Sequence, residues 1–215
     1  MSAFLAPIHT WLFNKILLAE DLESSLKKAY IDKYKDIAVE VAEKSLAYGN
    51  PIDTTRNIED IIDKSNIHGW LQEKISGVET RTAFTISEMI KKYGKEAEDI
   101  AALSFMNQGK TVGKTLNEKE MPQNPEELYN SLNIYLLEGM PCDRVTKLLK
   151  SENNILEWET TSCIHKKYWE MVNGDVNVFY DLRQRWIKAF IENSNDEFTY
   201  KFIEGKRAIN QIIGK

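Results

Sequence analysis

The sequence predicts a protein of the α+β class, with a mainly helical body and a small three-stranded antiparallel sheet in the C-terminal third of its 215 residues. Apolar residues recur every three or four positions through most of residues 1–140, as they do on the buried face of α-helices. Residues 156–161 and 198–202 instead alternate apolar and polar side chains, which is the pattern of half-buried strands. The strand at 198–202 is expected to complete a small sheet with a hairpin formed by residues 144–150 and 155–162, since three strands can be stable where two are marginal.

Length and composition favour one compact domain spanning residues 1–215, with a helical part at 1–140 and the hairpin, helices and last strand at 141–215. The 33 acidic and 28 basic side chains are interspersed, and the net charge of −5 argues against nucleic-acid binding. No apolar run reaches the roughly 18 to 20 residues that span a bilayer. Residues 1–13 lack the basic start of a signal peptide, so we expect a docked helix there, no membrane contact and a cytoplasmic location.

Helices in the first half are marked by their start and stop residues. Pro7 suits the first position of a helix, and a second helix ends at Gly49. Asn57 can cap a short helix, and a longer one runs from about Ile67 to Gly94. The apolar stripe of the first helix comprises Ile8, Trp11, Leu12, Ile16, Ala19, Leu22 and Leu26. His9 and His68 are each isolated within these patterns, so we expect partly buried or surface histidines rather than ligands, with His9 as a possible pocket wall because it lies one turn from aromatic residues.

Residues 95–112 predict another helix, whose buried side would carry Ile100, Leu103 and Met106. The segment that follows, 109–115, resembles a phosphate-binding loop. It has three residues between its glycines where that loop needs four, and it follows a helix rather than a strand. We therefore expect the end of a helix with solvated lysines.

The next helix should begin at Asn124, which is followed by a proline and two glutamates, and end at Gly139. Residues 144–150 fit either a strand or a helical turn. Asn153 and Asn154 can both adopt φ > 0, so they predict a type I′ turn that leads into the strand at 155–162. Two further helices are expected, one containing Tyr168 and Trp169 and one at about residues 175–192.

The segment after the hairpin strand contains the candidate reactive group. Cys163 and His165 could form a thiolate and imidazole pair, as in enzymes with a cysteine nucleophile. The alternative is a buried, inert cysteine beside an exposed histidine. Together with Cys142 and Asp181 these residues have the chemistry of metal ligands, but their spacings fit no metal motif. No metal or cofactor is therefore expected.

The helix at about 175–192 carries groups that could bind a small anionic ligand. Arg183 offers a bidentate fork for a carboxylate, and Asp181 or Tyr180 could position a polar atom. The alternative is an amphipathic helix whose charged residues are solvated or paired while its aromatic residues form core.

The run from residue 158 to 202 resembles the C-terminal half of the L-2-amino-thiazoline-4-carboxylic acid hydrolase family. The shared features are a strand ending in Thr-Thr-Ser-Cys163, a helix with two aromatic residues, a second helix, and a final strand Glu-Phe-Thr-Tyr-Lys-Phe. The aromatic and acidic residues that carry the resemblance on the two helices are Tyr168, Trp169, Tyr180 and Asp181.

This resemblance implies a pocket for a small amino-acid-like molecule and hydrolytic opening of a C–N-containing ring, with Cys163 as the transferable residue. The leading hypothesis is thus a hydrolase-like protein that acts on or binds a small amino-acid-derived compound. In it His165 would be a general base, Arg183 a carboxylate anchor, and Trp158 and Tyr168 pocket walls. The alternatives are a non-catalytic ligand-binding or sensor protein, and a helical protein that binds another macromolecule.

Overall fold

The computed structural model describes residues 6–205 and 208–215, and it confirms the α+β class. The chain separates into two compact units, each built from three segments. Unit 1 consists of Met1–Ile100, Leu137–Pro141 and His165–Asp175. Unit 2 consists of Ala101–Leu136, Cys142–Ile164 and Val176–Lys215. Each unit therefore draws on both predicted parts of the chain, and a single domain over 1–215 stays a prediction.

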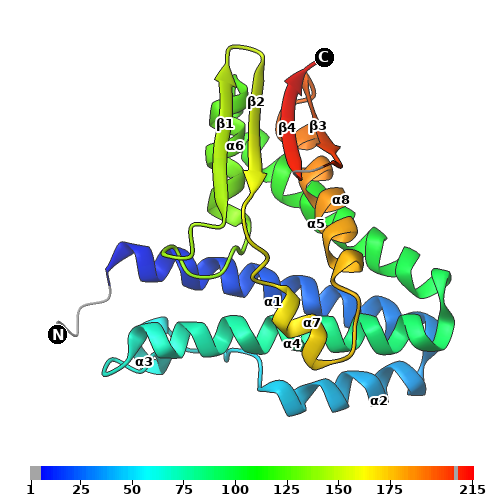
Figure 1. Ribbon diagram of the computed structural model, residues 1–215. Coiled ribbons are helices and arrows are strands. Elements are labelled where there is room, and N and C mark those ends of the chain that lie inside the picture. The colour runs from blue at the N-terminus through cyan, green and yellow to red at the C-terminus, as the bar shows by residue number, and fades with distance from the viewer. Residues whose placement is uncertain (1–5, 206–207) are drawn as a thin grey trace. The chain divides into compact units, whose positions relative to one another are not determined.

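Unit 1 is helical in the residues that the structure describes (Figure 1). Its elements are α1 (Pro7–Tyr34), α2 (Asp36–Ser45), the short 3-10 helix η1 (Leu46–Tyr48), α3 (Ile58–Ile61), α4 (Ile67–Tyr93) and α7 (Lys166–Met171). The helix α5 (Lys95–Glu120) begins in unit 1 and continues in unit 2. The predicted start at Pro7 and stops at Gly49 and Gly94 are confirmed. Residues 1–5 of the apolar start lie outside the described residues.

The two long helices α1 and α4 lie side by side and run in the same direction (Figure 1). His9 meets His68, Glu23 meets Arg81, and Tyr34 stacks on Tyr93 with ring centroids 3.8 Å apart, so these partners are 58 or 59 positions apart. This similar separation at three levels places the N-termini of the helices together and their C-termini together. Their shared core comprises Leu12, Phe13, Ile16, Leu71, Ile75 and Val78.

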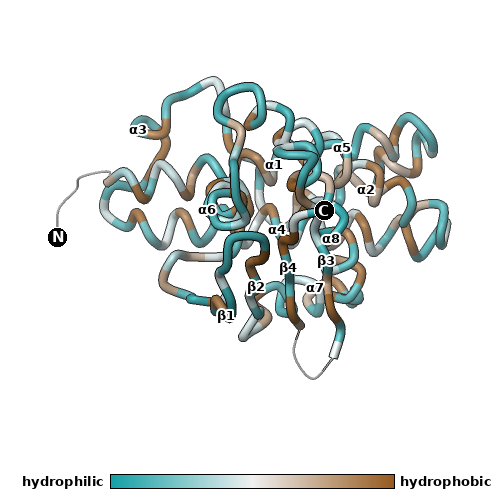
Figure 2. The backbone as a smooth tube through the Cα atoms, turned by 90° about the horizontal axis from the view of Figure 1, so that it is seen from above, coloured by the Kyte–Doolittle hydropathy of each residue, from teal (hydrophilic) through white to brown (hydrophobic). Residues whose placement is uncertain are grey.

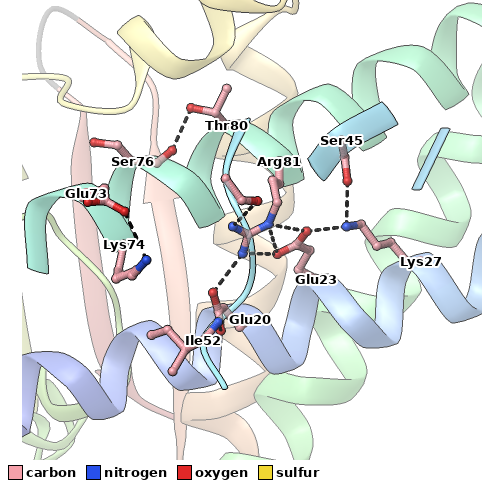
Figure 3. A network of polar contacts seen from close by, with 11 residues as sticks. Glu20, Glu23, Lys27, Ser45, Ile52, Glu73, Lys74, Ser76, Thr80 and Arg81 are labelled. Atoms are coloured by element: carbon pink, nitrogen blue, oxygen red, sulfur yellow. Dashed lines mark hydrogen bonds and ion pairs between the residues drawn. The ribbon is translucent and has the colours of Figure 1, made fainter. Parts of the chain in front are cut away.

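A buried ion network joins α1 to α4 in the middle of this core (Figure 3). Arg81, only 1% exposed, donates from Nε and Nη2 to the carboxylate of Glu23 at 2.8 to 3.0 Å. Its Nη2 also donates to Glu20 at 2.9 Å, and its Nη1 donates to the backbone oxygen of Gly49 at 3.2 Å. The guanidinium charge is thus neutralised by carboxylates held at fixed positions, as burial of a charge requires.

Unit 2 combines an antiparallel sheet with helices on one of its faces (Figure 1). Its elements besides α5 are α6 (Pro125–Tyr135), β1 (Thr146–Glu152), β2 (Ile155–Thr160), α8 (Val176–Ser194), β3 (Phe198–Ile203) and β4 (Ile209–Gly214). The strand order is β1-β2-β4-β3. Alternate residues such as Leu156, Tyr200 and Ile212, which lie opposite one another on neighbouring strands, are buried on the helix-covered face. Figure 2 shows the hydrophobic residues of the strands as brown segments of the backbone tube.

The predicted three-stranded sheet is corrected to four strands, because β4 was not recognised. This strand lies between β2 and β3, so it is the strand through which the predicted ones are joined. Its inward positions are Asn210 and Ile212, and its outward positions include Ile209 and Ile213. A polar residue facing the core and apolar residues on the other face cancel the period-2 pattern on which strand prediction depends.

The hairpin is confirmed, and residues 144–150, which also fitted a helical turn, mostly belong to the strand β1. Glu152 pairs with Ile155 across the two asparagines. The type I′ turn, however, is wrong. Among the described non-glycine residues, positive φ occurs at Lys35, Arg144 and Asn173, and a type I′ turn would need it at both asparagines. The register shift in β1 between Leu148 and Lys150 gives this strand a bulge.

Helix α5 extends eight residues beyond the predicted end at 112, and the glycines of the apparent phosphate loop lie inside it. A Cβ atom added to Gly109 would lie 2.4 Å from the backbone oxygen of Trp186, and one added to Gly113 would lie 2.4 Å from that of Phe190. The two glycines therefore let the backbone of α8 approach α5. Their role is close helix packing, which explains the spacing that looked like a loop.

The buried face of α5 also differs from the prediction. Leu103 and Met106 were expected to be buried, but they are 57% and 41% exposed. Small residues and one aromatic residue, Ala101, Ala102 and Phe105, take the buried positions. Small side chains on this face of α5 let neighbouring segments pack close to the helix. The prediction chose the more hydrophobic face of α5 and was therefore wrong. In the part of the chain that the structure describes, no helix is both long enough and apolar enough to cross a membrane.

Candidate functional site in unit 2

Unit 2 contains a cavity of about 600 Å³ between the end of the sheet and the first half of α8. Its lining comes from the residues after β2, from one face of α8, and from β3, β4 and the connection between these two strands. The lining residues are Thr160, Thr161, Ser162, Cys163, Asn177, Tyr180, Asp181, Arg183, Gln184, Ile187, Tyr200, Phe202, Glu204, Gly205, Ala208 and Asn210. Most of them are polar, so the cavity suits a small polar molecule.

Helix α8 places Arg183, which lies on the buried side of the helix, on the wall of the cavity. The buried positions of this helix include Leu182, Trp186 and Phe190, which follow at intervals of four. Arg183 is adjacent to the first of these and is only 8% exposed, while Asp181 is exposed. Residues two positions apart on a helix do not face each other, so Asp181 and Arg183 present opposite charges to different parts of the cavity.

A hydrogen-bonded pair on neighbouring strands forms another wall of the cavity. Tyr200 of β3 donates from its hydroxyl to Oδ1 of Asn210 of β4 at 2.6 Å, and both side chains are buried. Burial raises the pKa of the Tyr200 phenol well above its ordinary value, although the charge of Arg183 acts in the opposite direction. The phenol is therefore neutral at physiological pH, and the guanidinium lies close enough to influence it.

The segment that leaves β2 forms the rim of the cavity. Thr161 donates from its backbone N–H and from Oγ1 to the backbone oxygen of Val145, at 2.8 and 3.1 Å. These two bonds extend the pairing of β1 and β2 beyond the strands and hold the chain just before Cys163. The thiol of Cys163 is exposed and lines the cavity.

The structure thus brings four of the predicted site residues to one cavity: Cys163, Tyr180, Asp181 and Arg183. Trp158 belongs to the same unit but is packed in its core. Its ring centroid lies 5.0 Å from that of Tyr129 and 6.2 Å from that of Tyr200, and it is 3% exposed.

The other two predicted site residues, His165 and Tyr168, belong to unit 1. Tyr168 is buried, and its hydroxyl lies 3.2 Å from Nε2 of Gln72 and 3.4 Å from Oγ of Ser76 on α4. These contacts attach α7 to α4.

His165 is held as a cation between two carboxylates of unit 1. Its Nδ1 lies 3.1 and 3.2 Å from the oxygens of Glu79, and its Nε2 lies 3.6 Å from Glu138. Burial alone would lower the pKa of His165, but the charges of Glu79 and Glu138 outweigh it and raise the pKa to about 9. An imidazole that is already protonated at neutral pH does not accept a proton, so this environment favours a structural ion triad over a general base. The alternative of a buried cysteine beside an exposed histidine is wrong, since Cys163 is exposed and His165 is 2% exposed.

Sequence reasoning missed the lining residues Tyr200 and Asn210. The alternation of aromatic residues at 198–202 did place Tyr200 on an inward face, and that was the available signal. Asn210 had none, because its strand was not recognised. Across the described residues, no three side chains of His, Cys, Asp or Glu gather as a three-ligand metal centre needs.

In comparisons with protein-family models, with curated proteins and with solved structures, nothing matched this chain, and the hydrolase resemblance stays a proposal.

Proposed function

We propose that unit 2 binds a small amino-acid-derived compound in its cavity, with Arg183 taking the carboxylate and Asp181 pairing with the amino group. The observation that carries this proposal is the largely buried guanidinium on the wall of a cavity that also presents a carboxylate. The volume of about 600 Å³ lies within the range of roughly 300 to 1,000 Å³ that is usual for small-molecule sites. A planar guanidinium binds a carboxylate through two parallel hydrogen bonds, which fixes the orientation of the ligand.

Calorimetric titration with a panel of amino acids, their amides and their N-acetyl derivatives tests this proposal. Arg183→Gln should weaken binding of every carboxylate-bearing compound at least tenfold, and the amides should bind poorly to the wild type. Asp181→Asn should weaken binding of free amines but not of N-acetyl compounds. The control is Arg185→Gln, since Arg185 is exposed on the same helix and does not line the 600 Å³ cavity. No binding by the wild type to any compound of the panel would refute the proposal.

A second candidate function, hydrolysis, is favoured by the exposed thiol of Cys163 on the same cavity. The thiolate would bond to the carbon of a C–N bond of the ligand, and the nitrogen would leave with a proton. Water would then displace the sulfur and restore the thiol. This sequence consumes one water and needs no oxidant or reductant.

The two cysteines supply a matched comparison for this second function, because Cys142 and Cys163 are both exposed. Any difference in alkylation rate between them would report thiol activation rather than access. The assay is alkylation of the native protein from pH 5 to 9, with each cysteine followed by mass spectrometry. Faster reaction of Cys163 with an apparent pKa below the free value of about 8.5 is the expected result for a nucleophile. Equal rates would exclude the hydrolase and leave binding without catalysis.

A further inference from the structure

Two of the three histidines of the chain meet at one end of unit 1. Nε2 of His9 lies 3.1 Å from Nε2 of His68, with ring centroids 5.1 Å apart and an angle of 65° between the ring planes. His68 is exposed and His9 is partly exposed, so solvent reaches the pair. No sequence pattern predicts this contact, because the two residues are 59 positions apart.

The packing of α1 against α4 fixes this contact. Both helices begin at the same end of unit 1, and partners 58 or 59 positions apart meet near the start, the middle and the end of the pair (Figure 1). Just inside the pair, the rings of Phe13 and Trp70 pack with centroids 6.1 Å apart. The two imidazoles are therefore carried by helices that cannot slide past each other without breaking the core.

We propose that His9 and His68 form a binding site for a first-row transition-metal dication, which both Nε2 atoms coordinate while water fills the remaining positions. Two nitrogens 3.1 Å apart that each bind an ion at about 2.05 Å subtend an angle of about 98° at that ion. This angle lies between the cis angle of about 90° in square-planar or octahedral sites and the tetrahedral angle of about 109°. Imidazole nitrogen is a ligand that suits nickel, copper and zinc.

Binding requires one proton to change place. In the metal-free protein the backbone N–H of Ala6 donates to Nδ1 of His9 at 3.1 Å, so this imidazole carries its proton on Nε2 and donates it to His68. When the ion takes Nε2, the proton moves through solvent to Nδ1. The N–H of Ala6, which is partly exposed at the start of α1, then bonds to water. This exchange frees Nε2 of His9 to coordinate the ion, since a histidine binds a metal through an unprotonated ring nitrogen.

Both histidines lie in the first turn of a helix, where the helix dipole disfavours a cation. The affinity should therefore be moderate and should depend on both rings acting together. A true two-ligand site loses most of its affinity when either ligand is removed, whereas two independent surface histidines each keep theirs.

The test is calorimetric titration of the full chain with nickel(II) chloride and, separately, zinc(II) chloride at pH 7.5. Both exposed thiols are replaced with serine (Cys142→Ser and Cys163→Ser), so that sulfur cannot bind the metal. We expect one ion per chain, and at least a tenfold loss of affinity in His9→Gln and equally in His68→Gln. In NMR spectra, nickel(II) should broaden the ring signals of His9 and His68 and leave those of the buried His165 sharp. Absence of binding at millimolar metal, or an affinity in either single variant that equals the affinity of the protein with both histidines, would overturn the proposal.

Discussion

Deprotonation of His165 should cost unit 1 a large part of its stability between pH 6.5 and 9. The folded pKa of His165 is raised from the ordinary 6.5 to about 9, so the folded state binds the proton more tightly than the unfolded state. The stabilisation is therefore fully present below pH 6.5 and is lost as the pH rises through 9. At about 1.4 kcal/mol per pH unit, the difference between 6.5 and about 9 corresponds to about 3 kcal/mol. No discount for solvent screening is needed, because the side chain is 2% exposed.

The assay is urea unfolding at intervals from pH 6 to 10, for the wild type and for His165→Gln. The quantity of interest is the difference in unfolding free energy between the two proteins, since groups common to both cancel in it. This difference should fall by about 3 kcal/mol between pH 6.5 and 9 and then level off. Glu118→Gln is the control, because Glu118 is exposed on α5 in unit 2 and its replacement should leave the pH profile of the wild type unchanged between pH 6 and 10. A difference that does not vary with pH, or an NMR titration that gives His165 an ordinary pKa, would refute the ion triad.

Other predictions concern packing in each unit. Arg81→Ala should destabilise the protein by about 3 kcal/mol in urea unfolding, because the buried carboxylates of Glu20 and Glu23 lose the guanidinium that they share, although Glu23 keeps its ion pair with Lys27. A loss under 1 kcal/mol would contradict this. Gly109→Ala should lower the free energy of unfolding by about 1 to 3 kcal/mol, because the added Cβ meets a carbonyl oxygen of α8. The control is Lys110→Ala, which replaces an exposed residue and should change stability little. Equal effects of the two substitutions would argue against close helix packing. Tyr200→Phe should cost about 1 to 3 kcal/mol, measured in the same way, because Asn210 keeps a buried acceptor that has lost its donor. An unchanged midpoint would show that water replaces the phenol.

The elements that the sequence predicted well are those whose signals are local. Asn124 accepts a hydrogen bond from the backbone N–H of Glu127, and Pro125 occupies the first helical position, as expected from the residue types alone. Gly94 ends α4 with φ of 58°, a conformation that glycine adopts without strain. The hairpin was found for the same reason, since its strand alternates and its turn lies beside it. Local chemistry decides such features, so a single sequence contains them.

The features that escaped prediction depend on partners distant in the sequence. The buried side chain of Asn210 accepts a hydrogen bond from the hydroxyl of Tyr200. Strand β4 was not predicted because strand prediction expects apolar residues at the buried positions, and Asn210 is polar. His165 looked like a partner for the cysteine two positions before it, whereas its charge is fixed by Glu79, which is 86 positions away. Only the tertiary structure reveals such long-range pairs.

The same distinction between local and long-range signals separates the cavity residues that were predicted from those that were missed. Cys163 and the three residues on α8 could be nominated because each has a recognisable chemical group. Their convergence on one cavity required the position of the strands, since Tyr200 and Asn210 complete the lining.

The segments of the two units alternate along the sequence, and this order affects how the chain can fold during synthesis. The path passes from one unit to the other five times, and unit 1 is completed only by residues 165–175. On the ribosome, α4 with Glu79 is synthesised long before His165, so unit 1 lacks that imidazolium until most of the chain has been made. Unit 2 begins before unit 1 is complete and is itself completed only by residues 176–215, so the two units are not made one after the other as the domains of simple multidomain proteins are. A chain that ends at residue 164 would contain the rim cysteine but lack the segment that completes unit 1.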